Sequence, residues 1–318
     1  MRLQAFSGGI APDDELLWLA RRLDGHGQPD PVPPPRPAPV AARRPHRLSV
    51  TAVDTLINDP FAFYARAMLR LQPLDPIDQD PTAATRGTRV HAVMEEWIGS
   101  GGGSLERLEQ MTEAMLLAET RAFPLLRALW APRARRALAW AGAMVHAREA
   151  LGWQPLAAEA RGVLTLGNGI VIEGRADRID RDDDGRLAVI DYKTGKAPTP
   201  ANVRAGRANQ LALLMAMAGD GAMRSRSGGV PRGVSHALEY WEMGGGRDPG
   251  KVIDALKGKP PIAAADHVAA TIATVTTLTD RYLIGDAAFR PDLVANMGRG
   301  DYNHLARVAE WLDRPVRR

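Results

Sequence analysis

Acidic and basic residues gather between Gly174 and Gly195, in a stretch whose alternation and turn residues predict two strands joined by a tight loop. In the second strand, Asp191 and Lys193 fall on the face that carries the apolar residues before them. If residues 183–185 form the loop, Asp177 lies opposite Asp191, with Cβ atoms roughly 4.5–5.5 Å apart. Two carboxylates at that spacing repel each other unless a proton or cation lies between them. The hairpin therefore predicts a divalent metal site beside a lysine.

A histidine on a helix provides a further ligand for such a site. His91 lies in segment 85–98, whose apolar residues recur at helical spacing, and it shares one helix face with Glu95. His91, the two aspartates and the carbonyl oxygen of Tyr192 would hold Mg²⁺ or Mn²⁺, leaving positions for water and a phosphate oxygen. Lys193 would add a fixed positive charge, as phosphodiester hydrolysis requires. For Glu95 we favour a structural role, or a role in supporting the ligands from behind, over direct binding of the metal.

A single Asp-x-Lys sequence in a strand usually forms a surface ion pair, so the metal interpretation depends on the combination of residues. The combination includes Gln210, which lies on a later predicted helix and would orient the phosphate or the lysine. Taken alone, Gln210 is typical of a solvated side chain on an amphipathic helix.

The elements that must position these residues form a mixed α/β pattern. Apolar periodicity predicts helices first, then three antiparallel strands, a helix, a strand and a long helix. The order favours a mixed sheet flanked by helices, with further helices at both ends. The predicted strands are 159–166, 169–180, 186–193 and 234–243, and the principal predicted helices are 85–98, 104–122, 133–151 and 265–283.

Composition limits the class of protein. The 318 residues are 45% hydrophobic and 25% charged, enough for one large cored domain or two modest ones. No apolar run approaches the roughly 20 residues of a membrane-spanning helix, and the start lacks the features of an export signal, so we expect a cytoplasmic protein. The net charge of +4 permits binding to nucleic acid. With no cysteine, the sequence supplies no ligand for a cysteine-bound iron–sulfur cluster.

Proline density predicts the domain boundaries. Residues 28–46 are proline-rich and favour an extended linker. Residues 1–27 contain one amphipathic helix, at 12–24, too little for a domain, and are interpreted as a remnant of an upstream region. Residues 47–318 are then the catalytic domain.

Five arginines are candidates for contacts with a nucleic-acid backbone. Two explanations fit them: a groove that follows phosphates, or a solvated helix face. They are Arg86, Arg89, Arg133, Arg135 and Arg136.

A glycine-rich segment, 245–251, has the glycine and lysine spacing of a phosphate-binding loop. Val252 stands where a serine or threonine would hold Mg²⁺, so we expect a glycine-rich loop and no ATP site in this chain.

Four motifs follow one another along the chain: Gly87-x-x-x-His91, Gly174-x-x-Asp177, Asp191-Tyr192-Lys193 and Gln210. Together they resemble the RecB-type branch of the PD-(D/E)xK nuclease superfamily. Residues 47–76 and 301–311 are similar to the C-terminal nuclease region of the AddB family, alphaproteobacterial type, which belongs to AddAB helicase–nucleases.

The resemblance implies a restriction-endonuclease-like core. It also implies that His91, Asp177 and Asp191 are metal ligands, that Tyr192 contributes its carbonyl oxygen, and that Lys193 and Gln210 take part in catalysis. The implied activity is a Mg²⁺- or Mn²⁺-dependent exonuclease acting on linear DNA, single- or double-stranded, in the resection of double-strand breaks and recombinational repair. The implied partner is an AddA-type subunit.

The chain departs from the family pattern at two places. Leu214 replaces a tyrosine that commonly follows the glutamine, so its contact must be missing or supplied elsewhere. Asp59 stands before Pro60 where many relatives have a cysteine that binds an iron–sulfur cluster. Packing between the N-terminal helices and the C-terminal segment must therefore replace the cluster in holding these segments together. The alternative function is a non-catalytic DNA-binding or assembly module that docks a helicase–nuclease partner.

Overall fold

The structure is a computed structural model that describes residues 13–24, 33–72, 83–121, 124–226, 228–292 and 300–312. The chain divides into two compact units, Arg36–Tyr302 and a smaller unit of Met1–Pro35 with Asn303–Arg318. The smaller unit contains helices α1 (Asp14–Asp24) and α11 (Val308–Leu312). Helix α1 matches the helix predicted at 12–24, except that residue 12 lies outside the described residues. Its acids in the first turn and arginines in the last suit the helix dipole.

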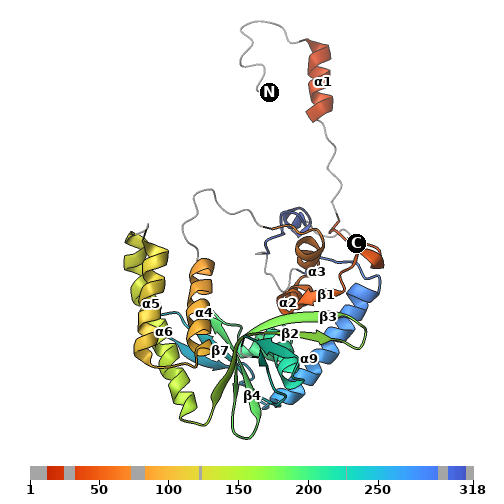
Figure 1. The fold of residues 1–318 in the computed structure, drawn as a ribbon. Helices are drawn as coiled ribbons and strands as arrows, with labels where there is room; N and C mark the ends of the chain where they lie inside the picture. The colour runs from red at the N-terminus through yellow and green to blue at the C-terminus, as the bar shows by residue number, and fades with distance from the viewer. Residues whose placement is uncertain are drawn as a thin grey trace. The chain divides into compact units, whose positions relative to one another are not determined.

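A mixed sheet forms the centre of the larger unit (Figure 1). In the described residues its order is β6-β5-β2-β3-β4-β7-β8, with β1 parallel to β3 and β4 parallel to β7. The strands are β1 (Arg47–Ser49), β2 (Gln154–Thr165), β3 (Val171–Arg181), β4 (Arg186–Lys193), β5 (Met223–Ser225), β6 (Gly228–Gly229), β7 (Val234–Glu242) and β8 (Lys251–Asp254).

Helices cover both faces of this sheet (Figure 1). On one face, α4 (Ala83–Gly99), α5 (Leu105–Thr120) and α6 (Pro124–Glu149) share an apolar core with β4 and β7. On the other face, α2 (Val50–Asn58), α8 (Gln210–Gly219) and α9 (Ala264–Thr279) form the larger core. The predicted fold class, a mixed α/β sheet flanked by helices, is confirmed.

Short helical segments complete the larger unit. They are η2 (Ala41–Arg43), α3 (Pro60–Phe63), the π-helical turn η3 (Tyr64–Met68), α7 (Pro200–Arg204) and the π-helical turn η4 (Asp280–Ile284).

The β3–β4 hairpin has the register predicted from its three-residue loop. Arg178 pairs with Ile190 and Arg181 with Leu187, and Gly185 adopts a positive φ of 78° in the turn. Since Leu187 and Val189 lie in the core beneath α8, alternation directs Asp191 and Lys193 to the same side.

Helix α6 differs from its prediction because it begins at Pro124 rather than near 133 and continues through Pro132. Proline normally ends or kinks a helix, but Trp130, Ala131 and Ala134 pack against Leu116 and hold the two turns together. Strands β1, β5, β6 and β8 were also missed. They have two to four residues each, too few for a periodic signal, and form only because a neighbouring strand pairs with them.

Aromatic packing joins the N-terminal helices to the segment after η4, as the cysteine-free sequence requires. Phe289 stacks on Phe63 and Tyr64, with ring centroids 5.9 and 6.0 Å apart. Asp59 caps α3, its Oδ1 accepting hydrogen bonds from the backbone N–H of Phe61 at 3.0 Å and of Ala62 at 3.1 Å.

Residues 36–46 of the proline-rich stretch pack against the same region. Buried Arg44 donates hydrogen bonds to the carbonyl oxygens of Pro39, Tyr282 and Ala287, and the backbone N–H of Phe289 donates to the carbonyl oxygen of Pro37.

Candidate metal centre

Helix α4 approaches the end of β4 closely because Gly87 has no side chain. A Cβ atom at this position would lie 2.9 Å from Thr194 Oγ1, closer than real Cβ contacts allow. One helical turn later, the same face of α4 presents His91. The Gly87-x-x-x-His91 spacing therefore places an imidazole beside the central strands.

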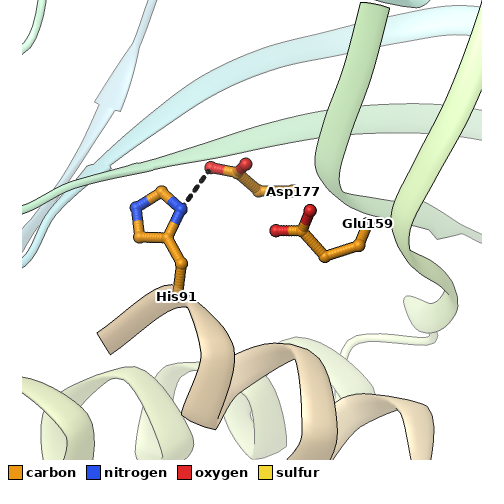
Figure 2. Close-up of side chains that lie close together, drawn as sticks. All are labelled: His91, Glu159 and Asp177. Carbon is orange, nitrogen blue, oxygen red and sulfur yellow. Dashed lines mark ion pairs between the residues drawn. The ribbon is translucent and has the colours of Figure 1, made fainter. Parts of the chain in front are cut away.

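His91, Glu159 and Asp177 form the candidate metal centre (Figure 2). His91 Nδ1 lies 3.5 Å from Asp177 Oδ2, and one ligand atom from each residue lies within 4.8 Å of the others. Figure 2 shows the two carboxylates and the ring facing a common space, with the histidine on a helix and the acids on strands. One imidazole nitrogen and two carboxylate oxygens fit the hard, oxygen-preferring ions Mg²⁺ and Mn²⁺.

The two acids leave the sheet at an irregularity that β2 and β3 share. Ala176 and Ile179 both lie in the core beneath α8, although residues three apart on a regular strand face opposite sides. Residues 157 and 160 on β2 show the same break, and between them Glu159 has a φ of +50°. A non-glycine residue in this region carries backbone strain of about 1–3 kcal/mol. Because alternation fails on both strands at one level, two acids reach the α4 side together.

Hydrogen bonds hold the aspartates. Asp177 Oδ2 accepts the backbone N–H of Tyr192 at 2.8 Å. Asp191 Oδ1 accepts from Gln210 Nε2 at 2.7 Å, and Asp191 Oδ2 lies 2.8 Å from Lys193 Nζ. The structure thus joins Asp191, Lys193 and Gln210 in one group and His91 with Asp177 in another, and the cluster of three within the described residues does not include Asp191.

Charge is crowded between these two groups. Burial, followed by the charge of Asp177, raises the pKa of Asp191 to about 6, against the opposing effect of Lys193. Burial and the charge of Asp177 also raise the pKa of Glu159. Burial alone would lower the pKa of His91, but the hydrogen bond and charge of Asp177 outweigh it, so the pKa is raised. Such mutual repulsion is what a bound cation relieves.

A cleft of about 350 Å³ opens onto the cluster. Its lining includes His91, Glu95, Glu159, Arg175, Tyr192 and Lys193. Glu95 lies at its rim, where its carboxylate pairs with Arg226 at 3.2 Å. The nearby charge of Glu95 contributes to the raised pKa of Glu159.

Two residues, Leu214 and Tyr240, show what occupies the region where the family pattern expects a tyrosine. Leu214 is fully buried above Gly174, where an added Cβ would lie 2.6 Å from Leu214 Cδ2. Tyr240, paired with Asp191 across β4 and β7, has its ring centroid 5.9 Å from Lys193 Nζ. Burial strongly raises the pKa of Tyr240, so its phenol stays protonated. An aromatic ring beside the lysine thus comes from β7 and not from α8.

The five arginines predicted to contact nucleic acid divide into two groups. Arg89 pairs with Glu119 at 2.9 Å, and Arg135 pairs with Glu113, so both join helix α5 to its neighbours. Arg133 and Arg136 are exposed on α6, and Arg86 is half-buried on α4.

Among the described residues, every helix is too short or too polar to cross a lipid bilayer.

A family model for the PD-(D/E)XK nuclease superfamily matches residues 47–293. This chain belongs to the PD-(D/E)XK nuclease superfamily. Membership indicates nuclease activity, the hydrolysis of phosphodiester bonds, and agrees with a cluster of metal-ligand type beside an Asp-x-Lys strand end.

Curated relatives share part of the chain. A protein of Rickettsia bellii described as uncharacterized is 30% identical over 178 residues, covering 53% of this chain and 21% of that protein. A second, from Rickettsia conorii, is 27% identical over 179 residues with the same coverage. The matching region is thus about a fifth of their length. A solved structure titled "Crystal structure of SSO0001" aligns with 85% of this chain and 88% of its own chain, at 12% sequence identity and a TM-score of 0.27. A similarity this low does not bear on the fold or function of the present chain.

Glu159 is the candidate ligand that the sequence analysis missed. A signal was present, because the turn at Gly167–Gly169 sets Leu166 opposite Ile170, and counting back from that pair sets Glu159 opposite Asp177.

Proposed function

We propose that this chain is a divalent-metal-dependent deoxyribonuclease that hydrolyses phosphodiester bonds at the ends of linear DNA, as an exonuclease. One observation carries the proposal. Two members of the metal cluster, His91 and Glu159, line a single cleft together with Lys193, the ion-pair partner of Asp191, within a chain of a nuclease family.

In this proposal His91, Glu159 and Asp177 hold Mg²⁺ or Mn²⁺, and Asp191 and the carbonyl oxygen of Tyr192 complete the ligand set. When bound, the ion supplies charge neutralisation at phosphate and a lowered pKa for water.

The remaining polar groups act through position and charge. Lys193 Nζ offers a fixed positive charge to the scissile phosphate. Gln210 orients Asp191 through its 2.7 Å hydrogen bond, and the Tyr192 N–H orients Asp177. Arg86, Arg133 and Arg136 are the sequence-based candidates for further phosphate contacts, and Glu95 has a structural role beside the ligands.

For the biological setting we infer end resection at double-strand breaks and recombinational repair, with an AddA-type helicase–nuclease as partner. The support is the similarity of residues 47–76 and 301–311 to AddB-type nuclease regions. Residues 47–318 would be the nuclease domain, following the linker at 28–46 and the upstream remnant at 1–27.

Incubation of linear single- and double-stranded DNA with Mg²⁺ or Mn²⁺ tests the activity. We expect release of nucleotides by the wild type, and loss of release with Asp177→Asn or Lys193→Ala. Glu173→Gln, which removes an exposed acid of β3, is the matched control. Degradation that persists in both site variants would refute the assignment.

One observation favours the alternative, a non-catalytic DNA-binding or assembly module. Asp191 is bound to Lys193 and Gln210 and lies outside the ligand cluster. Titration calorimetry with Mn²⁺ separates the two functions, since a nuclease must bind the ion at a site that Asp177→Asn weakens, whereas a scaffold need not.

A further inference from the structure

Part of the sheet face next to the cleft is open to solvent. Beneath α4 to α6 this face is buried at Ile190, Tyr192 and Trp241. Towards the β2, β3 and β5 end it is exposed at Arg161 and Arg224, and Val163 retains 45% of its accessible surface.

Three arginines lie side by side on the open face. Arg161 on β2 pairs in register with Arg175 on β3 and with Arg224 on β5. The residue next to each one, Gly162, Gly174 and Met223, faces the core beneath α8. Alternation therefore places all three arginines, the arginine row, on the opposite side, where the metal cluster lies.

A row of like charges directly opposite one another destabilises a sheet unless anions neutralise it. Arg175 is neutralised, because its Nε lies 2.6 Å from Glu159 Oε2. Arg161 and Arg224 form no ion pair with any described residue. The open end of the row is thus a site of uncompensated positive charge, and the other end contacts a candidate metal ligand.

We propose that the arginine row binds successive phosphates of a single DNA strand and leads that strand into the cleft. This inference deepens the proposed function and rests on it. The substrate class follows from charge, since a polyanion neutralises the row without burying apolar surface, and from position, since Arg175 joins the row to Glu159.

The dimensions suit one strand of nucleic acid. Neighbouring strands of a sheet lie about 4.7–4.9 Å apart, so three arginines span roughly 10 Å. Each nucleotide of a stacked strand rises about 3.4 Å along the axis, so the row spans roughly three nucleotide steps. Arg226, on the turn after β5, is paired with an acid as Arg175 is, since it lies 3.2 Å from Glu95 at the cleft.

The test is binding of a fluorescent oligothymidine in EDTA, where hydrolysis is prevented, over a range of salt concentrations. The variant is Arg161→Gln with Arg224→Gln, both exposed, so the fold should be retained, and melting temperature verifies this. Removing two phosphate contacts should weaken binding by about tenfold and reduce the slope of log affinity against log salt by about 1.4.

The matched control is Arg186→Gln with Lys257→Gln. It removes the same charge at Arg186, where β4 begins, at the opposite end of that strand from Lys193, and at the exposed Lys257 after β8. A second comparison is Arg133→Gln with Arg136→Gln on α6. We expect both to change the slope less than the row variant does. An equal loss in the control, a larger loss in the α6 variant, or an effect seen only with blunt duplex overturns the single-strand path.

Hydrolysis assays with Mn²⁺ keep this result apart from the proposed nuclease activity. With wild-type hydrolysis present, the row variant should raise KM while leaving kcat unchanged at saturating DNA. If the wild type binds DNA through the row but hydrolyses none, the nuclease proposal fails and the row stands. If it hydrolyses DNA with binding unaffected by the row variant, only the row fails.

Discussion

Asp177 and Asp180 are both buried acids of β3, yet their surroundings are opposite. Asp180 Oδ2 accepts hydrogen bonds from Arg178 Nη2 at 2.7 Å and from Arg148 Nε at 2.9 Å. Arg148 also pairs with Glu239, which accepts the indole N–H of Trp241. Asp177 has a neutral backbone donor and one imidazole for partners, and it lies near two further acids.

The difference separates a structural carboxylate from a ligand carboxylate. A buried charge costs free energy unless partners compensate it. At Asp180 the protein supplies both partners. At Asp177 it supplies more acids, and burial first and the charge of Asp177 second raise the pKa of Glu159 and of Asp191. Burial alone therefore does not identify a site, whereas a buried acid that lies among other acids does.

The largest expected effect is on stability, at the structural carboxylate Asp180. Asp180→Ala leaves two arginines without their shared partner, so the free energy of unfolding should fall by about 3–5 kcal/mol. Urea denaturation measures it. Asp184→Ala, which removes an exposed acid from the turn after the same strand, should change stability by less than about 1 kcal/mol. A similar loss in both variants would remove the distinction between the two surroundings.

Hydrolytic activity, unlike stability, should depend on the residues at the candidate metal centre. Lys193→Ala or Asp177→Asn should lower kcat by about 10²–10³-fold, or roughly 2.7–4 kcal/mol, because Lys193 supplies positive charge to the phosphate and Asp177 holds the metal ion. The free energy of unfolding of Asp177→Asn should not decrease, since the change relieves repulsion among carboxylates. Paired kinetics and denaturation decide this, and a strong destabilisation would make Asp177 a structural residue like Asp180.

A bound metal ion should stabilise the fold through the acids around Asp177 and not through Asp180. Mn²⁺ at about 100 times its Kd should add about 2.7 kcal/mol to the free energy of unfolding, read as an upward shift in Tm. Glu159→Gln should reduce the shift because it removes a charged ligand, whereas Glu173→Gln should leave it unchanged. A full shift in the Glu159 variant would exclude that residue from the ligand set.

The smallest effect concerns the distance between α4 and β4. Gly87→Ala should cost about 1 kcal/mol, because the new methyl group overlaps Thr194 Oγ1. Displacing α4 moves His91 away from Asp177, so Mn²⁺ affinity should fall as well. Adding Thr194→Ala should restore both quantities, and no recovery would mean that the Gly87 contact does not set the position of His91.

The sequence alone determined the parts of the molecule that local chemistry controls. Alternation and turn residues fixed the β3–β4 register, and with it the common face of Asp191 and Lys193. The helical stripe and the Gly87-x-x-x-His91 spacing placed the histidine on a helix. These signals are local because neighbouring residues suffice to specify a turn or a periodicity.

The turn at Gly167–Gly169 already indicates that Glu159 lies opposite Asp177, but only the tertiary structure shows that both acids reach the α4 side. The break in alternation at these residues involves both strands at once, so the sequence of either strand does not reveal it. The arginine row likewise requires β5 to pair with β2, and β5 has only three residues. Asp177 and Asp180 look alike in the sequence, and long-range partners such as Arg148 distinguish them. Cations that neutralise a buried acid come from distant segments, so their positions become known only when the chain is folded.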